Sequence, residues 1–163
     1  MKIIDQHSNR RPQSGFSLVE VMIALVIMSI GMLGIAGLYV QSLQAGRTSM
    51  FRHHAVTLAG DIADRIRANP TAAAAYDHLP NDAGVDNGCV MGGVDCTVGE
   101  MAANDIFLWQ AQADDTLPGG NVSVTFAAAV GLNPPTYEIT VSWNEPAQVT
   151  VPTYVITIPV RPI

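Results

Sequence analysis

Positive charge is scarce in this sequence. The 163 residues include eight Lys and Arg against fourteen Asp and Glu, and the single lysine is Lys2. Residues 1–15 carry +2 of the formal net charge of −6, which leaves −8 for the remainder. Because phosphate contacts need positive charge, the acidic remainder is a poor polyanion binder, and we expect no direct nucleic-acid binding. The length suits one domain with its own core and is hardly enough for two.

Charge is missing altogether from Val21 to Val40. In the apolar segment 16–40 the polar residues are Ser17, Glu20 and Ser29. About 20 apolar residues are enough for a helix to cross the hydrocarbon core of a bilayer. We therefore predict a transmembrane helix over residues 16–40. The alternative is a buried helix of a soluble protein, although such helices rarely stay free of charge for so long.

The fifteen residues before this segment are short, polar and basic. Lys2, Arg10 and Arg11 outnumber Asp5. Because positively charged flanks stay in the cytoplasm, we expect a single-pass protein of the bacterial inner membrane. Its N-terminus would face the cytoplasm, and the chain after Val40 would face the periplasm.

Cysteine is also scarce: only Cys89 and Cys96 are present, both in the predicted periplasmic part. In an oxidising compartment an even pair of cysteines predicts a disulfide. The alternative is a zinc site, which needs more ligands than these two residues supply locally. His78 is too isolated in sequence to complete one. We predict a Cys89–Cys96 disulfide and neither a metal nor a cofactor.

The start of the apolar segment carries the most specific motif. A secretory signal peptide is cut after its apolar region, at small residues, and no such site follows Val40. The hexapeptide at residues 15–20, Gly-Phe-Ser-Leu-Val-Glu, instead resembles the prepilin cleavage motif of the type IV pilin superfamily. The resemblance implies that a prepilin peptidase and N-methyltransferase removes a leader, residues 1–15, by cutting between Gly15 and Phe16. It also implies methylation of the new Phe16 amine.

Glu20 is a carboxylate inside the apolar segment. At the centre of a membrane helix it would cost about 2.5–3.5 kcal/mol, and less near the interface, so we expect it to have a partner. The nearest candidate is the α-amino group of Phe16, four residues earlier on the same helix face. The pilin resemblance implies an assembly role for Glu20, in which it meets the N-terminal amine of a neighbouring subunit. The alternative is a carboxylate that reaches the lipid headgroups.

Three glycines repeat inside the apolar segment, at Gly31, Gly34 and Gly37, and no proline occurs between Phe16 and Asn69. Glycine permits close helix approach, and also local melting of a helix. These three glycines would then allow close helix approach or local melting of this helix. The alternative, given equal weight, is that they reflect only the ordinary use of glycine in membrane helices.

A second, amphipathic half of the same helix is predicted over residues 41–69. One face repeats apolar residues at spacings of three and four: Phe51, Ala55, Leu58, Ile62 and Ile66. Asp61 with Arg65 and Asp64 with Arg67 stand at helix-pairing distances on the solvated side. The helix is expected to end near Ala68, because the residue before a proline avoids helical geometry.

The remaining chain is predicted as an irregular αβ-loop region, residues 70–118, and antiparallel strands in residues 119–163. In the first, Thr97 to Glu100 has the form of a capping box that opens a helix through about Gln112. Its inward residues are expected to be Ala103, Phe107 and Trp109. In residues 119–163, alternation of apolar residues indicates three strands, each with one buried face. The residues expected on the buried faces are Val122, Val124, Phe126 and Ala128 in the first strand, Tyr137, Ile139, Val141 and Trp143 in the second, and Tyr154, Ile156, Ile158 and Val160 in the third. Pro152 and Pro159 place the last strand at an edge.

These elements give an α+β fold class, with one long N-terminal helix packed on a small antiparallel sheet of three to four strands. This is also the architecture that the pilin resemblance implies. Within that superfamily, several blocks look like the PilV-type minor pilins: residues 29–38, 58–70, 104–109, 117–120 and 137–143.

The resemblance implies a non-catalytic minor pilin that primes or supports type IV pilus assembly. Its partners would be other minor pilins, the major pilin, the inner-membrane assembly platform and, before assembly, membrane lipid; the pilus or cell surface would be its final location. The alternative is a minor pseudopilin of a type II secretion system, which shares the leader, the glutamate and the helix. A DNA-uptake pilin would be expected to display a basic stripe, and the exported part has only five arginines.

An enzyme is not indicated. The four histidines, His7, His53, His54 and His78, lack a nucleophile and an acid nearby in sequence, and solvation is their expected role. The acids Asp82, Asp86, Asp95, Asp105, Asp114 and Asp115 lack EF-hand spacing, and we interpret them as solvated loop acids.

Overall fold

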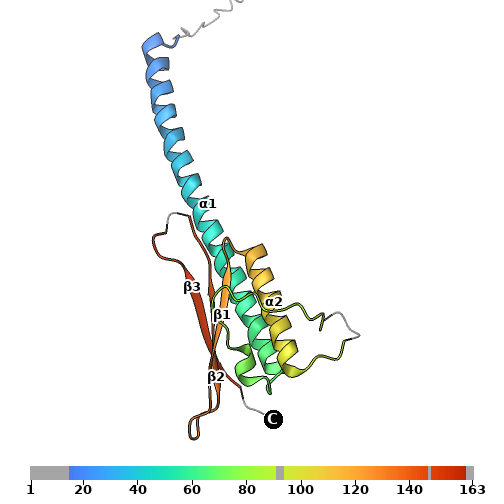
Figure 1. Ribbon diagram of the computed structural model, residues 1–163. Helices are drawn as coiled ribbons and strands as arrows, with labels where there is room; N and C mark the ends of the chain where they lie inside the picture. The colour runs from blue at the N-terminus through green and yellow to red at the C-terminus, as the bar shows by residue number, and fades with distance from the viewer. Residues whose placement is uncertain (1–14, 91–93, 147, 161–163) are drawn as a thin grey trace, which may run out of the picture. The chain divides into compact units, whose positions relative to one another are not determined.

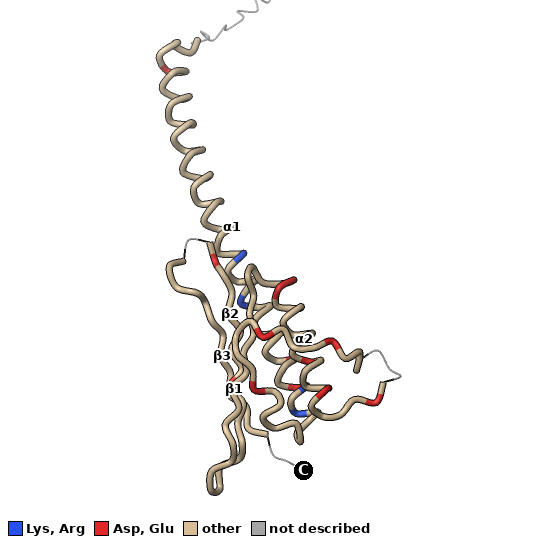
Figure 2. Tube along the Cα trace, viewed as in Figure 1, with Lys and Arg blue, Asp and Glu red and all other residues tan. Residues whose placement is uncertain are grey.

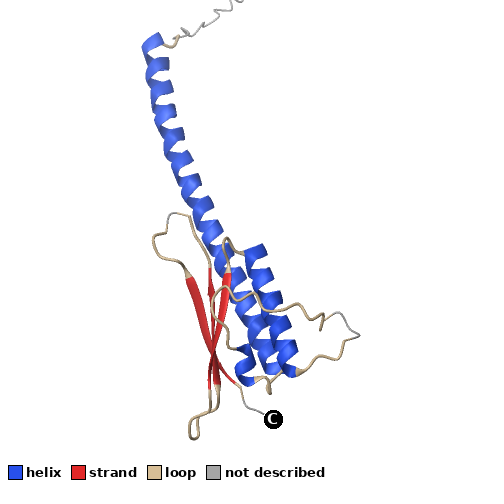
Figure 3. Ribbon diagram, in the orientation of Figure 1, coloured by secondary structure: helices blue, strands red, loops and turns tan. Residues whose placement is uncertain are grey.

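The computed structural model describes residues 15–90, 94–146 and 148–160 (Figure 1). The predicted leader, apart from Gly15, and Arg161 lie outside the described residues. The elements in chain order are helix α1 (Leu18–Ala68), 3-10 helix η1 (Ala73–Tyr76), helix α2 (Val98–Thr116) and strands β1 (Asn121–Ala127), β2 (Thr136–Ser142) and β3 (Thr153–Pro159) (Figure 3). The chain divides into two compact units, Met1–Gln44 and Ala45–Ile163, which are described separately below.

The first unit contains the apolar half of α1. Every residue from Gly15 to Gln44 is exposed, including large apolar side chains such as Leu33 (74%) and Ile35 (69%). By length and composition, α1 is the one helix among the described residues that could cross a membrane. The helix begins at Leu18, two residues after the predicted start, and runs through Gly31, Gly34 and Gly37 without interruption.

The second unit contains the amphipathic half of α1, which buries one face. Its buried residues are Ala55, Leu58, Ala59, Ile62, Ala63 and Ile66. The predicted apolar face is therefore confirmed, with Phe51 only half-buried at its edge. Both predicted ion pairs are present, Asp61–Arg65 at 3.2 Å and Asp64–Arg67 at 2.9 Å. The helix ends at Ala68, as the following Asn-Pro pair predicts.

Helix α2 follows the predicted capping box. The Thr97 side chain accepts a hydrogen bond from the Glu100 backbone, and the Glu100 side chain accepts one from the Thr97 backbone. The helix continues to Thr116, four residues beyond the expected end. Trp109 is buried as predicted, but the inward placement of Ala103 and Phe107 is wrong.

The buried face of α2 is defined by a different set of small and apolar residues. These are Ala102, Ile106, Trp109 and Ala113, at spacings of four, three and four. Ala103 and Phe107 each follow a member of this set by one residue. One residue rotates a helix by about 100°, and both side chains are consequently only half-buried.

The sheet has the strand order β1-β2-β3, and both pairs are antiparallel. Strand β2 lies in the centre, and its predicted inner residues Tyr137, Ile139 and Val141 are all buried, as is Trp143 just after it. Strand β3 is an edge strand, as predicted from its prolines. Ala128 is exposed and lies beyond the end of β1, because β1 pairs with β2 only as far as Ala127.

The core of the second unit lies between the helices and one face of the sheet. In Figure 1, α2 lies beside the part of α1 that belongs to this unit. Apolar residues of both helices, of η1 and of all three strands form a single buried cluster. The opposite face of the sheet presents mainly Ser, Thr and Glu side chains. The fold is thus the α+β, pilin-like arrangement of one long helix and a small antiparallel sheet.

Candidate functional site

The predicted processing site lies immediately before α1. Gly15 and Phe16 are exposed, and the Phe16 side chain is 82% accessible. The first helical turn closes behind them, where the Ser17 carbonyl accepts hydrogen bonds from the backbone N–H groups of Glu20 (3.1 Å) and Val21 (3.2 Å). The Gly15–Phe16 bond is therefore outside the helix and open to another protein.

Phe16 and Glu20 line the same shallow groove along the start of α1. The groove has a volume of about 370 Å³, and its other walls are apolar. Glu20 is exposed, and its carboxylate has no hydrogen-bond or ion-pair partner among the residues that the structure describes. A carboxylate in apolar surroundings is costly unless a cation or a donor meets it, and none of the described residues that line the groove with Glu20 carries a positive charge.

The second unit holds a polar network that links α1, η1 and α2. Arg65 on α1 donates to the Asp105 carboxylate on α2 at 3.0 Å, and the Tyr76 hydroxyl donates to the other carboxylate oxygen at 2.8 Å. Asn69 donates to the Tyr76 oxygen at 3.3 Å and to the Val98 carbonyl at 3.0 Å. Asp105 is 3% exposed, so its charge depends on these donors rather than on water.

The network and its surroundings shift the pKa values of its members. Burial raises the pKa of the Tyr76 hydroxyl, and the adjacent Asp105 carboxylate raises it further. For Arg65, partial burial lowers the pKa, but Asp105 and Asp61 together outweigh it, so the net pKa is raised. Tyr76 is therefore a neutral donor and Arg65 a charged donor to the Asp105 side chain.

A disulfide joins Cys89 and Cys96, whose Cα atoms are 5.9 Å apart. The segment before it is fixed to α2 by one buried side chain. The side-chain amide oxygen (Oδ1) of Asn104 accepts from the backbone N–H groups of Asn87 (2.9 Å) and Cys89 (3.3 Å). Asn87 in turn donates to the Glu100 carbonyl at 3.0 Å. Asn104 and the disulfide therefore hold this irregular segment against the start of α2.

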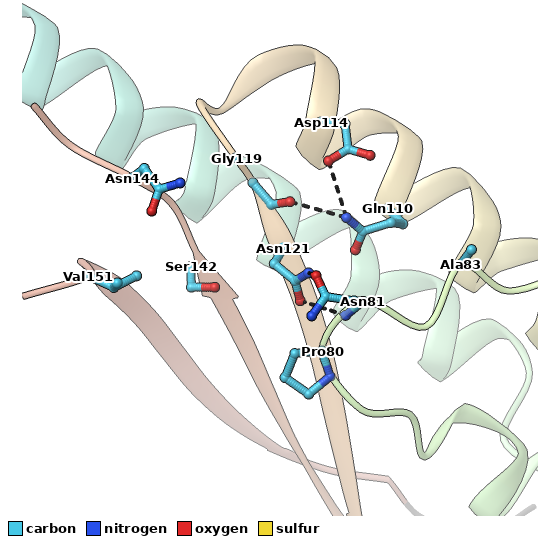
Figure 4. Close-up of a pocket in the computed structure, with 11 residues that line it drawn as sticks. Pro80, Asn81, Ala83, Gln110, Asp114, Gly119, Asn121, Ser142, Asn144 and Val151 are labelled. Atoms are coloured by element: carbon cyan, nitrogen blue, oxygen red, sulfur yellow. Dashed lines mark hydrogen bonds between the residues drawn. The ribbon is translucent and has the colours of Figure 1, made fainter.

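A polar groove of about 500 Å³ lies where α2 meets the start of β1 (Figure 4). Two of its amide side chains bond to each other, since Asn121 donates to the Asn81 side chain at 2.7 Å, and Gln110 donates to the Gly120 carbonyl at 3.1 Å. Gly119 has φ +56°, and a Cβ there would lie 2.3 Å from the Asn144 amide. These contacts brace the turn from α2 into β1.

Acidic residues predominate in the second unit. Figure 2 shows most of them on α2 and on the segment before it, and Asp61 and Asp64 lie on α1; the described cations of this unit all lie on α1. The interpretation of Asp105 as a solvated loop acid is wrong, because it is buried in a helix and paired. Within the described residues, no group of three or more His, Cys, Asp and Glu side chains is placed to hold a metal ion.

His78 also differs from its expected solvated role. It is 6% exposed, its ring nitrogen lies 3.0 Å from the Tyr76 carbonyl, and its backbone pairs with that of Val124 along the outer edge of β1. The contact that buries it is set by the packing of the irregular segment against β1. No local sequence pattern indicates the contact between His78 and β1, because the two segments are distant in sequence. Asp105 was detectable, since it stands between the buried Ala102, Ile106 and Trp109 and therefore needs a partner.

Two family models match the sequence. The prokaryotic N-terminal methylation motif matches residues 10–36, and the type IV pilin model Tt1218-like matches residues 37–107. No curated protein and no solved structure gives a significant match. The methylation motif implies processing by a prepilin peptidase, and type IV pilins are structural proteins rather than enzymes. The exposed apolar helix is consistent with a membrane-anchored pilin.

The first match covers α1 as far as Ala36, and the second runs from Gly37 through the rest of α1 to the middle of α2. Together they support a relationship between this chain and the type IV pilin superfamily.

Proposed function

We propose that this protein is a minor pilin, most similar to the PilV type, which primes or supports assembly of a type IV pilus. In this proposal the leader is removed between Gly15 and Phe16, and the new N-terminus is methylated. The observation that carries the proposal is the apolar half of α1, which is fully exposed and directly follows the processing motif. Such a surface needs lipid before assembly and other subunits afterwards.

Glu20 has a specific role in this proposal. Its carboxylate shares a groove with Phe16 on the first turns of α1 and lacks a cation in the described chain. The N-terminal amine of a neighbouring subunit would supply the positive charge, so the pair would form only when two helices are in the correct register. Before assembly, Glu20 would lie near the membrane interface, where a carboxylate costs less.

The partners follow from the same steps. A prepilin peptidase and N-methyltransferase would act on the cytoplasmic side, and the assembly platform of the inner membrane would extract the helix. Other minor pilins and the major pilin would then surround it. The second unit would remain periplasmic until assembly and reach the cell surface with the pilus.

Mass spectrometry of the mature protein tests the processing step. We expect an N-terminal residue that is a methylated Phe16. An intact leader, or an N-terminus elsewhere, would contradict it.

A Glu20→Gln variant should be processed normally and yet fail to restore pili, while the matched exposed variant Glu138→Gln should restore them.

A deletion strain tests the assembly role. We expect lost or sparse surface pili together with normal protein secretion. Normal pili with failed secretion would instead identify a minor pseudopilin of a type II secretion system. That alternative shares the leader, Glu20 and the N-terminal helix, so only the downstream sequence blocks, the neighbouring genes and this phenotype separate it from the proposal.

A further inference from the structure

The connection between β2 and β3 is held against α1 at the start of the second unit. Its described residues are 143–146 and 148–152. The Glu145 carboxylate accepts hydrogen bonds from the Thr48 hydroxyl of α1 and from the Gln148 amide, the latter at 3.0 Å. The Trp143 backbone N–H donates to the Pro152 carbonyl at 3.2 Å and closes the base of the connection. The β2–β3 connection is therefore fixed at the level of Thr48 on the helix.

This connection exposes apolar side chains in an uncharged stretch. Val149 is 104% exposed and Val151 is 58% exposed. From Pro146 to Val160 the sequence has no charged residue. Single exposed apolar residues are ordinary on protein surfaces, so exposure alone does not identify a partner. The position of the connection along the chain does.

The length of α1 places the connection close to the membrane. The charge-free residues from Val21 to Val40 match the hydrocarbon core of a bilayer, about 30 Å. The helix continues without a break to Thr48, eight residues later, which is about 12 Å farther along its axis. The headgroup layer takes up about 5–8 Å of that distance. The remaining gap of about 4–7 Å is within what the usual helix tilt of about 20° covers for a segment beside the helix.

The opposite end of the sheet offers a matched comparison. Leu132, in the connection between β1 and β2, is also 104% exposed. Because β2 pairs with both neighbours in antiparallel fashion, its two connections lie at its two ends. The seven residues of β2 span about 23 Å. Leu132 and Val149 are thus equally exposed, and only Val149 lies at the end that Thr48 marks.

We propose that Val149 and Val151 contact the phospholipid headgroup layer on the outer side of the inner membrane before assembly. The proposal rests on the membrane anchoring in the proposed function. It adds a second membrane contact, made by the globular unit rather than by the apolar helix. Exposed charges of both signs lie near this end, Arg47 on α1 and Asp114 on α2, so the contact requires no anionic lipid. Extraction of the helix during assembly would break it.

A single fluorescent label at each of two positions tests the contact. The two cysteines of the chain are joined in the disulfide, so Val149→Cys or Leu132→Cys supplies the one free thiol for an NBD fluorophore. Both side chains are fully exposed, so neither change should disturb the core. The chain without its leader is reconstituted at low density into phosphatidylcholine vesicles that carry a nitroxide quencher on the headgroups. We expect blue-shifted, strongly quenched emission at position 149 and neither effect at position 132.

Anchoring is measured separately with Ile35→Cys, within the apolar half of α1, and with lipids that carry the nitroxide in the acyl chain. Quenching at position 35 together with equal signals at 149 and 132 would overturn this proposal and leave the anchor intact. No quenching at position 35 would overturn the anchor and the contact that rests on it. A signal at position 149 that appears only at high protein density would assign the connection to a second copy of the chain, and would also overturn the lipid contact.

Glu145 is the residue that positions the connection, and its role has its own test. Glu145→Ala removes the carboxylate that meets Thr48, so the label at position 149 should lose most of its quenching. Glu138→Ala, on the exposed face of the sheet, should keep the quenching. Unfolding followed by tryptophan fluorescence checks that both variants are folded. Equal quenching in the two variants would overturn the positioning role of Glu145.

Discussion

The two halves of α1 belong to one helix but differ in what surrounds them. In residues 18–44 every side chain is exposed, although nearly all are apolar. In residues 45–68 apolar and polar faces are separate, and the apolar face is buried in the core of the second unit. A helix that is apolar all round depends on an external partner, whereas an amphipathic helix is stabilised by its own domain. The amphipathic half therefore stabilises the second unit, whereas the apolar half would serve assembly if the proposed function holds.

Matched truncations in the two halves test this difference most strongly. Ile62→Ala removes a fully buried side chain, and the lost burial plus the cavity should lower the free energy of unfolding by about 2–5 kcal/mol. Ile35→Ala removes a 69% exposed one and should change it by less than about 0.5 kcal/mol. Denaturant unfolding in detergent, followed by tryptophan fluorescence, measures this, because both tryptophans lie in the second unit. Equal effects of the two variants would remove the distinction.

After its apolar face, the second half of α1 stabilises the second unit most through the buried polar network of Arg65, Tyr76 and Asp105. Asp105→Asn keeps the shape but removes the charge that Arg65 and Tyr76 meet. Hydrogen bonds to charged groups contribute about 1.5–3 kcal/mol each, and we expect a loss in that range, since Arg65 is 35% exposed and keeps some hydration. Asp64→Asn is the control, because its ion pair with Arg67 is exposed and should contribute less than about 1 kcal/mol. A loss with Asp64→Asn as large as with Asp105→Asn would show that burial does not matter.

Periodic patterns predicted most of this fold. The spacing of Leu58, Ile62 and Ile66 predicted the buried face of α1, and the alternation of Tyr137, Ile139 and Val141 predicted the central strand. Both signals depend only on local geometry, which the sequence carries directly. The errors fall where distant segments decide burial. Ala103 and Phe107 were misplaced because the apolar face of α2 is defined partly by alanines, which carry little hydrophobic signal.

The candidate sites divide in the same way. Gly15, Phe16 and Glu20 stand in a continuous motif, so the sequence alone predicts their roles, and those roles remain predictions until the processing and assembly experiments. The polar groove where α2 meets β1 joins Asn81 to Asn144, 63 positions later, and no local pattern indicates it. Asp105 lies between these cases, because the argument applied to Glu20, that a carboxylate among apolar residues needs a partner, applies equally to it.

The capping box of α2 gives a smaller effect, confined to the second unit. Thr97→Ala removes the side chain that accepts from the Glu100 backbone, and loss of such a cap costs about 1 kcal/mol. Thr116→Ala is the matched control at the other end of α2, where the hydroxyl donates only to the Gln112 carbonyl. Fluorescence-detected unfolding should show a lower midpoint for the first variant alone. Equal shifts would mean that the cap contributes nothing beyond a lost threonine.

The smallest expected effect is the acid dependence of the same cap. The Glu100 carboxylate accepts from the Thr97 backbone N–H at 2.9 Å and from its hydroxyl at 2.8 Å, and these bonds lower the pKa of Glu100 below its ordinary value of 4.5. A lowered pKa in the folded state means that the stabilisation is present above pH 4.5 and is lost as the pH falls through the folded-state pKa. Unfolding midpoints measured from pH 7 to pH 3 should therefore fall less steeply in Glu100→Gln than in the wild type. Glu138→Gln, which removes an exposed glutamate from the outer face of the sheet, should keep the wild-type slope. If instead it flattens the profile as much as Glu100→Gln does, net charge rather than the cap controls the acid response. The stability of the second unit would then depend on its net charge in the surrounding solution, just as the apolar half of α1 depends on a partner outside the chain.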